Sequence, residues 1–480
     1  MARAAPRAPV ASPLAICGLR LLRKQPMTTL LVHPATHPLR GSVPVPSDKS
    51  IGHRALLLGA LCQGATHIEG FSRGEDNVST AHALRAMGVL IDEPSPSSLV
   101  VHGVGLDGLL APNHPLDCGN SGTTMRLLCG VLAGQRFATV LMGDESLSRR
   151  PMGRVASPLR ARGAVVRGHP HPTRPSEIVA PLEVGPLPLG SELTELEWTS
   201  EISSAQVKSA VLLSGLFARG VTRFSEPTLS RDHTERMLRA LGCPLRTSGA
   251  IVEVDPGGWS RRMPAFDITI PGDLSAAAFP LVAAQCVTGS DVTVRNVGVN
   301  PTRTGWLEIA RDMGAGIAAT PRGEQGGEPV AELRGWRTPL RASLVGGETV
   351  ARAIDEIPIV CALAARAAGT TRIRDAEELR HKESDRIATM VEVLRAFGIV
   401  CHERLDGLDV EGRPEPLEPA DIDCRGDHRI AMTAAVLALS ASAPSRIRGA
   451  ECIATSYPKF VATMRALGAG IDVDDGGSPK

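Results

Sequence analysis

Cationic and hydroxyl side chains gather at the predicted starts of several helices in this sequence. In the segment VPSDKSIGHRALLLGAL (45–61), Lys49, Ser50 and Arg54 lie at a turn marked by proline that leads into an apolar helix. The first N–H groups of a helix are unpaired and carry partial positive charge, so hydroxyls and cations beside them form a site for an anion. These residues alone leave an alternative, in which Ser47 or Ser50 caps the helix and the charges are solvated.

Two further segments combine small residues, hydroxyls and arginines. DCGNSGTTMRLL (117–128) opens a predicted helix near Gly122, where the backbone can approach a ligand closely, and places Arg126 in its first turns. GDESLSRRPMG (143–153) places Arg149 and Arg150 in a loop that leads into another helix. For the first segment, an ordinary glycine turn with an N-cap is an equally simple explanation.

Four more segments bring charged and hydroxyl residues to predicted helix starts. They are ISSAQVKSA (202–210), SRDHTERML (230–238), HKESDR (381–386) and GDHRIAM (426–432), and the residues concerned are Ser203, Ser204, Gln206, Lys208, Arg231, His233, Lys382, Glu383, Asp385, Arg386, Asp427, His428 and Arg429. Each segment alone is also explained as a solvated helix face. Together they predict multiply anionic substrates that are held by several arginine forks.

The composition argues against other classes of function. The 480 residues include 52 basic and 51 acidic side chains, and a net charge of +1 gives no overall field for nucleic acid or an anionic membrane. Aromatic residues make up 3% of the chain, too few for a base-stacking platform, and no apolar run is long enough to span a bilayer. We therefore expect neither a nucleic-acid partner nor a membrane.

Common cofactor and metal motifs are missing from the sequence. It contains no GxxxxGK[ST], HExxH or EF-hand loop. GVGLDG (103–108) matches GxGxxG, but Pro112 and Pro115 follow where a dinucleotide site needs its helix. Ten cysteines without a CxxC pair indicate reduced, buried thiols and a cytoplasmic protein.

The elements that must position these residues appear as a repeat. Six decapeptides each end an amphipathic helix, stop it at a glycine and continue into an apolar strand: ALRAMGVLID (83–92), PLRARGAVVR (158–167), MLRALGCPLR (237–246), IARDMGAGIA (309–318), VLRAFGIVCH (393–402) and TMRALGAGID (463–472). Their glycines fit the left-handed position that ends a helix. The pattern predicts six α/β units, three before about residue 264 and three after, in two similar halves that face a cleft.

Residues 1–26 form an N-terminal extension with a composition of its own. They contain four arginines, one lysine and no acidic residue, which is typical of an organelle transit peptide. Pro6, Pro9 and Pro13 would interrupt a targeting helix, so we favour the alternative that the native chain starts at Met27. In that case the extension is disordered or not native.

Taken in order, the segments resemble the enolpyruvyl transferases, and among them the 5-enolpyruvylshikimate-3-phosphate synthase family. The resemblance covers residues 42–464, and the segments that carry it are SDKSIGHRALLLGAL, GNSGTTMRLL, GDESLSRRPMG, SSAQVKSAVLL, SRDHTERM, IDEIPI, LRHKESDR, GDHRIAM and TSYPKF. The resemblance implies an α/β fold of two similar domains, each an inside-out α/β barrel of three repeated units, with an interdomain cleft. We expect residues 46–264 to form the first domain, and residues 27–45 with 265–480 the second.

The resemblance also implies a reaction. The enolpyruvyl group of phosphoenolpyruvate would move to the 5-hydroxyl of shikimate 3-phosphate, with release of phosphate, by addition and elimination through a tetrahedral intermediate. This step of aromatic amino acid biosynthesis would need no metal and no organic cofactor. We expect a cytoplasmic monomer.

Residue roles follow from the resemblance position by position. The implied catalytic residues are Asp355, Glu383 and Lys49. Shikimate 3-phosphate would contact Lys49, Ser50, Arg54, Ser204, Ala205, Gln206, Arg231, Asp355 and Lys382. Phosphoenolpyruvate would contact Lys49, Gly122, Arg150, Gln206, Arg386 and Arg429.

Some positions depart from the pattern or leave alternatives open. Some relatives have a lysine where this chain has Thr455, and Lys459 is a weak substitute for it. Asp355 could simply cap the apolar helix that follows it. The related transferase that acts on UDP-N-acetylglucosamine usually has a reactive cysteine where this chain has Glu145, and a non-catalytic anion-binding relative is a further alternative.

Overall fold

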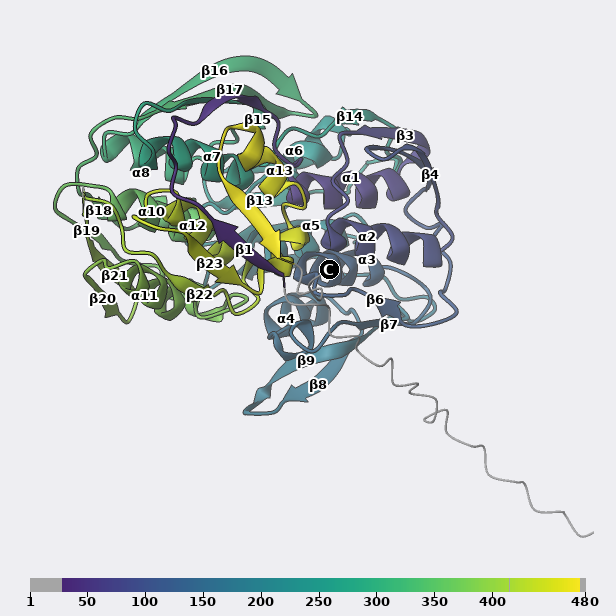
Figure 1. The fold of residues 1–480 in the computed structure, drawn as a ribbon. Helices are drawn as coiled ribbons and strands as arrows, with labels where there is room; N and C mark the ends of the chain where they lie inside the picture. The colour runs from purple at the N-terminus through teal and green to yellow at the C-terminus, as the bar shows by residue number, and fades with distance from the viewer. Residues whose placement is uncertain (1–27, 414, 475–480) are drawn as a thin grey trace, which may run out of the picture.

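The computed structural model describes residues 28–413 and 415–474 of the chain (Figure 1). The expectations for residues 1–26 and for a start at Met27 lie outside these residues. The described chain contains six four-stranded sheets of one topology, in which a parallel pair of strands is extended by two antiparallel strands. The α/β fold class and the six units predicted from the sequence are confirmed.

Three of the sheets consist of strands from residues 63–269. In sheet order they are β14 (Asp267–Thr269), β3 (Gln63–Glu69), β5 (Ser98–Val104) and β4 (Leu90–Ser95); β6 (Leu116–Asp117), β7 (Thr139–Met142), β9 (Arg174–Val184) and β8 (Val166–His171); and β10 (Leu196–Thr199), β11 (Thr222–Ser225), β13 (Ile251–Val254) and β12 (Leu245–Ser248).

The other three sheets combine the second half with the N-terminal strands. They are β2 (Arg40–Val43), β15 (Asp291–Gly298), β17 (Glu328–Trp336) and β16 (Gly316–Gln325); β18 (Leu344–Val345), β19 (Thr370–Ile373), β21 (Gly407–Glu411) and β20 (Cys401–Arg404); and β22 (Asp421–Asp423), β23 (Ser445–Arg448), β1 (Thr29–Val32) and β24 (Ile471–Asp474). In Figure 1 the purple β1 accordingly lies among green and yellow elements.

Each unit also contains an inner and an outer helix. The inner helices are α1 (Lys49–Leu61), α3 (Gly122–Leu132), α5 (Ala205–Gly215), α7 (Leu274–Cys286), α10 (Ile357–Ala365) and α12 (His428–Ala438). They are apolar on nearly all sides, and every residue of α7 and α10 is buried. A helix that is hydrophobic all round belongs in a core, so these helices lie inside and the sheets lie outside them.

The outer helices are amphipathic and end as the repeat predicts. They are α2 (Glu75–Ala86), α4 (Gly153–Ala161), α6 (His233–Ala240), α8 (Gly305–Asp312), α11 (Arg386–Ala396) and α13 (Phe460–Ala466). The six predicted glycines that follow them have φ between 74° and 101°. At Gly163 and Gly242 an added Cβ would meet no atom within 4 Å, so the left-handed backbone, rather than crowding, favours glycine there.

Short helical segments complete the described chain. They are α9 (Glu348–Ala351) and the 3-10 turns η1 (Leu147–Arg149), η2 (Ile354–Glu356), η3 (Glu377–His381) and η4 (Ala450–Thr455). No helix among the described residues is long and apolar enough to cross a bilayer.

Two hydrophobic cores divide the described chain. One extends from Ile51 to Ile270, and the other combines the N-terminal strands with residues from Leu274 onwards. We therefore propose two domains, with crossings near 44–50 and 271–273. The strand β14 lies beyond the expected boundary at residue 264 but pairs with β3, so the first domain includes it.

The first crossing ends at Asp48, which caps α1. Its Oδ1 accepts a hydrogen bond from the Ile51 N–H (3.0 Å), and its Oδ2 lies 3.0 Å from Nη1 of the buried Arg303. The alternative cap residues Ser47 and Ser50 are therefore wrong for this helix. Burial acts to raise the pKa of Asp48, but Arg303 and the Ile51 N–H lower it from 3.8 to about 2.

Asp48 should make part of the stability depend on pH. A carboxyl group with a depressed pKa stabilises the fold above its unfolded pKa and loses that contribution as the pH falls through its folded pKa, here between about 4 and 2. The contribution is about 2 kcal/mol at neutral pH, and about 1 kcal/mol of it is lost by pH 3. Urea unfolding midpoints should therefore differ between the wild type and Asp48→Asn at pH 6, and this difference should narrow by pH 3. A difference that stays constant would contradict the assignment.

Candidate active site

The predicted site residues lie at helix starts in both domains. Side-chain oxygens accept hydrogen bonds from the first turns of α3, α5, α11 and α12 at the N-cap residues Ser121, Ser204, Asp385 and Asp427. These caps satisfy some of the unpaired N–H groups, and the partial positive charge of each helix start remains. Helix starts of both domains therefore favour anions.

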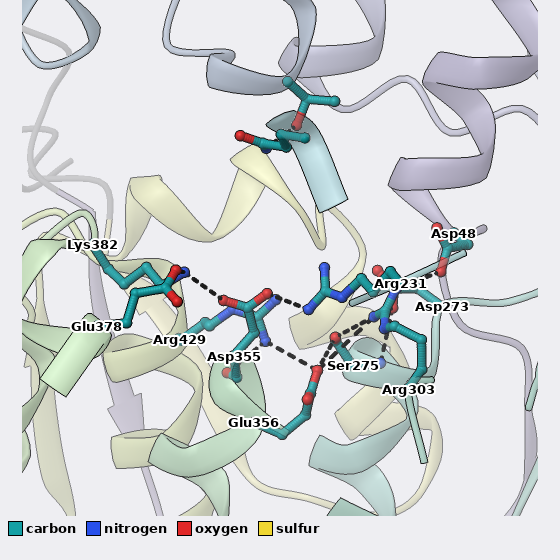
Figure 2. A network of polar contacts seen from close by, with 12 residues as sticks. Asp48, Arg231, Asp273, Ser275, Arg303, Asp355, Glu356, Glu378, Lys382 and Arg429 are labelled. Atoms are coloured by element: carbon teal, nitrogen blue, oxygen red, sulfur yellow. Dashed lines mark hydrogen bonds and ion pairs between the residues drawn. The ribbon is translucent and has the colours of Figure 1, made fainter. Parts of the chain in front are cut away.

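Asp355 lies at the centre of a group of cations from both domains (Figure 2). Its Oδ2 is 2.5 Å from Nη2 of Arg231, which belongs to the first half of the chain. Its Oδ1 is 3.8 Å from Nζ of Lys382 and 3.4 Å from Nη1 of Arg386. Nη1 of Arg429 donates to the Asp355 main-chain oxygen at 2.9 Å. The structure therefore brings together these five predicted site residues.

The position of Asp355 excludes the alternative role of a helix cap. Asp355 lies in the turn η2, and α10 begins at Ile357 without a capping bond from a side chain. Burial acts to raise the pKa of Asp355, but Lys382, Arg231, Arg429 and Arg386 hold it well below its ordinary value. The carboxylate is therefore ionised at neutral pH and attracted strongly to its neighbours.

The second predicted carboxylate, Glu383, contacts the buried Arg386. Its Oε2 lies 2.6 Å from Nη2 of Arg386, whose Nε lies 2.8 Å from Oδ2 of Asp427. Burial acts to raise the pKa of Glu383, but the charges of Arg386 and Arg150 lower it. Burial and Arg429 lower the pKa of His428 to about 3, so this ring is neutral at neutral pH.

Lys49, at the first position of α1, is paired with an acid that the sequence analysis missed. Its Nζ lies 2.6 Å from Oδ2 of Asp76, in the first turn of α2. Burial acts to lower the pKa of Lys49, but Asp76 and, from the second domain, Glu383 raise it above its ordinary value. Lys49 is therefore a charged ammonium held beside the second domain. A lone acid at a helix start gave no distinctive signal in the sequence.

The start of α3 forms a narrow cradle that involves Arg126, which the sequence analysis placed in the first turns of this helix without a role in binding. Nη1 of Arg126 donates to Oε1 of Gln206 (2.8 Å), and Nε2 of Gln206 donates to Oγ1 of Thr123 (2.8 Å). A Cβ at Gly122 would lie 2.5 Å from Nη1 of Arg126 and 3.4 Å from that of Arg150. Glycine therefore lets both guanidinium groups approach the backbone. Arg126 lies within the GNSGTTMRLL segment, which was the available signal.

Electrostatics in this cradle favour an additional anion. Burial and the neighbouring Arg150 lower the pKa of Arg126 to about 10. Nη2 of Arg150 donates to Oδ1 of Asn120 at 2.5 Å, which leaves its charge without a carboxylate partner at this contact. Two close guanidinium groups repel each other, and a bound carboxylate or phosphate would relieve this repulsion.

Arg54 and Lys208 contact other protein side chains. Arg54 is 3% exposed, and its guanidinium donates to Thr234 Oγ1, Ser209 Oγ and the Ser50 main-chain oxygen. Lys208 is 1% exposed and forms ion pairs with Glu226 and Glu235, both 2.8 Å. Lys208 therefore supports the packing of α5 and α6. Arg54 holds the main chain of Ser50 at the start of α1.

The remaining positions of interest lie at the edges of the site. Ser204 and Ala205 are half-buried at the start of α5, where Ser204 Oγ accepts from the Val207 N–H. Thr455 approaches the first domain, because a Cβ at Gly74 would lie 3.0 Å from its carbonyl oxygen. Lys459, before α13, is exposed.

Known proteins provide an independent comparison. The family model described as EPSP synthase (3-phosphoshikimate 1-carboxyvinyltransferase) matches residues 34–464. A 3-phosphoshikimate 1-carboxyvinyltransferase from Geobacter sulfurreducens is 48% identical over 438 residues, which cover 91% of this chain and 99% of the relative. Another, from Acidithiobacillus ferrooxidans, is 46% identical and covers 93% of this chain and 99% of the relative.

Solved structures give the same result. An EPSP synthase structure from Acinetobacter baumannii superposes with a TM-score of 0.83 at 40% identity, and the match covers 93% of this chain and all of that chain. The enolpyruvyl transferase NikO from Streptomyces tendae gives a TM-score of 0.73 at 18% identity, covering 93% and 99% of the two chains. The second similarity supports the fold alone.

Proposed function

This chain belongs to the EPSP synthase family, and we propose that Asp355 and Glu383 move the protons of its reaction. The chain transfers the enolpyruvyl group of phosphoenolpyruvate to shikimate 3-phosphate, a step in aromatic amino acid biosynthesis. The observation that supports these roles best is the pair of ionised carboxylates beside Arg386.

Phosphoenolpyruvate would bind where arginines of both domains meet. Arg386 and Arg429 belong to the second domain, and Arg150 and Gly122 to the first. Gln206 and Lys49 would complete this site. Because the donor carries a carboxylate and a phosphate, forks from two directions both bind it and draw the domains together.

Shikimate 3-phosphate would also lie between the two domains. Its phosphate would contact the start of α5, at Ser204, Ala205 and Gln206, together with Arg231. Lys49, Ser50, Arg54, Asp355 and Lys382 would line the rest of this subsite. We infer that Arg54 acts by its charge and by holding Ser50, because its nitrogens donate to protein groups.

The addition step requires the 5-hydroxyl to lose a proton as its oxygen attacks C2 of phosphoenolpyruvate, while C3 gains a proton. Asp355 is the proposed base toward the hydroxyl. A carboxylate with so low a pKa is a weak base, but the substrate phosphate would draw Arg231 away from it. The pKa of Asp355 would then rise toward the range in which it can accept the proton.

Proton transfer at C3 is assigned to Glu383, with Lys49 as an assisting acid. Because the Glu383 carboxylate is ionised, the proton that C3 gains would reach it from the Lys49 ammonium, which would recover a proton in the elimination step. In the elimination step the tetrahedral intermediate loses phosphate, and the methyl group at C3 returns a proton to restore the enol. The same carboxylate can perform both transfers, because the second reverses the direction of the first. The guanidinium of Arg386 beside Glu383 would stabilise the negative charge on both substrates.

Phosphate release from the purified protein tests this function. Release should require both phosphoenolpyruvate and shikimate 3-phosphate, and replacing the second by UDP-N-acetylglucosamine should abolish it. Release with phosphoenolpyruvate and the sugar nucleotide, but not with phosphoenolpyruvate and shikimate 3-phosphate, would favour the alternative transferase. Binding without turnover would favour the non-catalytic alternative. Glu145 pairs with Arg149 at the position of the rival's reactive cysteine, and eight of the nine cysteines in the described chain are buried, which supports the first outcome.

We further propose that the protein acts as a cytoplasmic monomer, without a nucleic-acid or membrane partner. The nearly balanced charge and the low aromatic content support this proposal. The residues assigned to both substrates come from one chain, so a second copy is not needed to complete the site.

A further inference from the structure

The two chain crossings between the domains form a short ladder of hydrogen bonds. The Asp48 N–H donates to the Pro271 oxygen (2.7 Å), and the Asp273 N–H donates to the Pro46 oxygen (2.8 Å). Between these bonds, Ser47 and Gly272 form an antiparallel bridge. Because these two paired segments connect the cores, any rotation of one domain against the other must bend them.

Arg303 holds both segments at their ends (Figure 2). It lies between β15 and α8 and is 3% exposed. Nη1 is 3.0 Å from Oδ2 of Asp48, the cap of α1, and Nη2 is 3.0 Å from Oδ1 of Asp273, the cap of α7. One guanidinium therefore fixes the first helix after each crossing.

The same guanidinium reaches the catalytic region through Ser275 and Glu356. Nη2 of Arg303 donates to Ser275 Oγ at 2.7 Å, and that hydroxyl donates to Oε1 of Glu356. Glu356 is 1% exposed and follows Asp355 in the chain. Its Oε1 lies 3.9 Å from both Arg303 Nη2 and Arg429 Nη1. A buried polar path thus connects the crossings with Asp355 and Arg429.

The charges in this cluster require a forked cation. Burial acts to lower the pKa of Arg303, but Asp48, Asp273 and Glu356 raise it above its ordinary value. A planar guanidinium directs separate N–H groups at separate acceptors, whereas a lysine ammonium is a compact point charge on a flexible stem. Lysine at this position would preserve the charge but could not direct separate N–H groups at Asp48, Asp273 and Ser275 in the same way.

We propose that Arg303 is a positioning residue for the transfer reaction. It fixes the interdomain crossings relative to Glu356, and it thereby positions Asp355 and Arg429 against the part of the site that belongs to the first domain. This inference rests on the proposed function. A displacement of the reacting groups by about 1 Å from the productive geometry can lower the rate of the reaction by about 10²-fold. In the described chain, Arg303 itself contacts no residue assigned to either substrate, and the cluster approaches a subsite only through Glu356 and Arg429, so the effect should appear mainly in turnover and in the use of phosphoenolpyruvate.

Arg303→Lys tests the proposal, with Arg352→Lys as the matched control. Arg352 also forms a fork, with both oxygens of Glu308 at 2.5 and 2.6 Å. Neither residue of this pair forms an ion pair with the described residues around Arg303. We expect Arg303→Lys to lower kcat by about 10²-fold and to raise the KM for phosphoenolpyruvate. The dissociation constant for shikimate 3-phosphate should change less than about threefold, because most of its proposed contacts lie on the first domain. Arg352→Lys should keep normal kinetics.

A second variant covers the case in which Arg303→Lys does not fold. Glu356→Gln keeps the size and an oxygen acceptor for Ser275 but removes the charge toward Arg429. It should raise the KM for phosphoenolpyruvate more than it changes the binding of shikimate 3-phosphate. Melting temperatures, together with kinetics measured well below them, separate misplacement from unfolding.

The outcomes distinguish this inference from the proposed function. Absence of turnover in the wild type would refute the function itself. With an active wild type, normal kcat in Arg303→Lys at a lowered melting temperature would show a merely structural role and overturn the inference. So would an equal loss in Arg352→Lys, or unaltered kinetics of Glu356→Gln when Arg303→Lys fails to fold.

Discussion

Asp355→Asn should lower turnover by about 10² to 10⁴, the usual loss when a general base is removed. Asparagine keeps the size of the side chain and an oxygen that can accept from Arg231, but it cannot take the proton of the attacking hydroxyl. Binding of shikimate 3-phosphate should be preserved or strengthened, because Arg231 and Lys382 would no longer be held by a carboxylate. Steady-state kinetics and equilibrium titration of the same variant measure both effects.

Asp409→Asn is the control for loss of a paired carboxylate. Asp409 is 6% exposed and lies 2.6 Å from nitrogens of both Arg374 and Arg404, as part of β21. Its replacement should reduce stability with little effect on turnover. If Asp355→Asn keeps near-normal turnover, Asp355 does not act in proton transfer. If both variants lose activity in proportion to the decrease in their melting temperatures, the loss caused by Asp355→Asn reflects impaired folding.

Glu383→Gln should also lower turnover by about 10² to 10⁴, because glutamine cannot carry the proton to and from C3. The KM for phosphoenolpyruvate should not rise, since Arg386 would lose a competing carboxylate at 2.6 Å and become more available to the donor. Exchange of the C3 protons with deuterated water should slow in parallel with turnover. This isotope measurement distinguishes the role of Glu383 from that of Asp355, because Asp355 is assigned to the proton of the hydroxyl and not to those at C3.

Glu378→Gln provides the matched control for this second variant. Glu378 pairs with Lys382 at 2.8 Å on the exposed side of the same loop, and it contacts neither Arg386 nor Asp427 in the described chain. Its kcat and its KM for phosphoenolpyruvate should remain close to those of the wild type, and any change should be limited to the affinity for shikimate 3-phosphate, because Glu378 pairs with Lys382. A large rise in KM for Glu383→Gln with an unchanged kcat would instead mean that Glu383 only orients Arg386.

Local patterns carried much of the fold and of the site chemistry. The left-handed backbone that ends each outer helix favours glycine, and the residues before and after it form a helix end and a strand start. This local pattern allowed six units to be counted from the sequence. Caps and cations at helix starts also depend only on neighbouring residues, so the sequence alone indicated anionic substrates. The family resemblance then supplied the roles of Asp355 and Glu383, which composition and spacing did not.

Contacts between distant segments were decided only by the tertiary structure. Arg231 and Asp355 are 124 residues apart, and they meet because the chain crosses twice between two cores. The same crossings bring Arg303 to Asp48, a residue 255 positions away. A pattern along the chain reports which side of an element is buried, but it contains no information about which other element lies there. Asp76 beside Lys49, Arg126 beside Gln206 and the Arg303 cluster were therefore beyond the sequence. The first contact depends on how the two helices of one unit pack, and the other two depend on how separate units pack against each other.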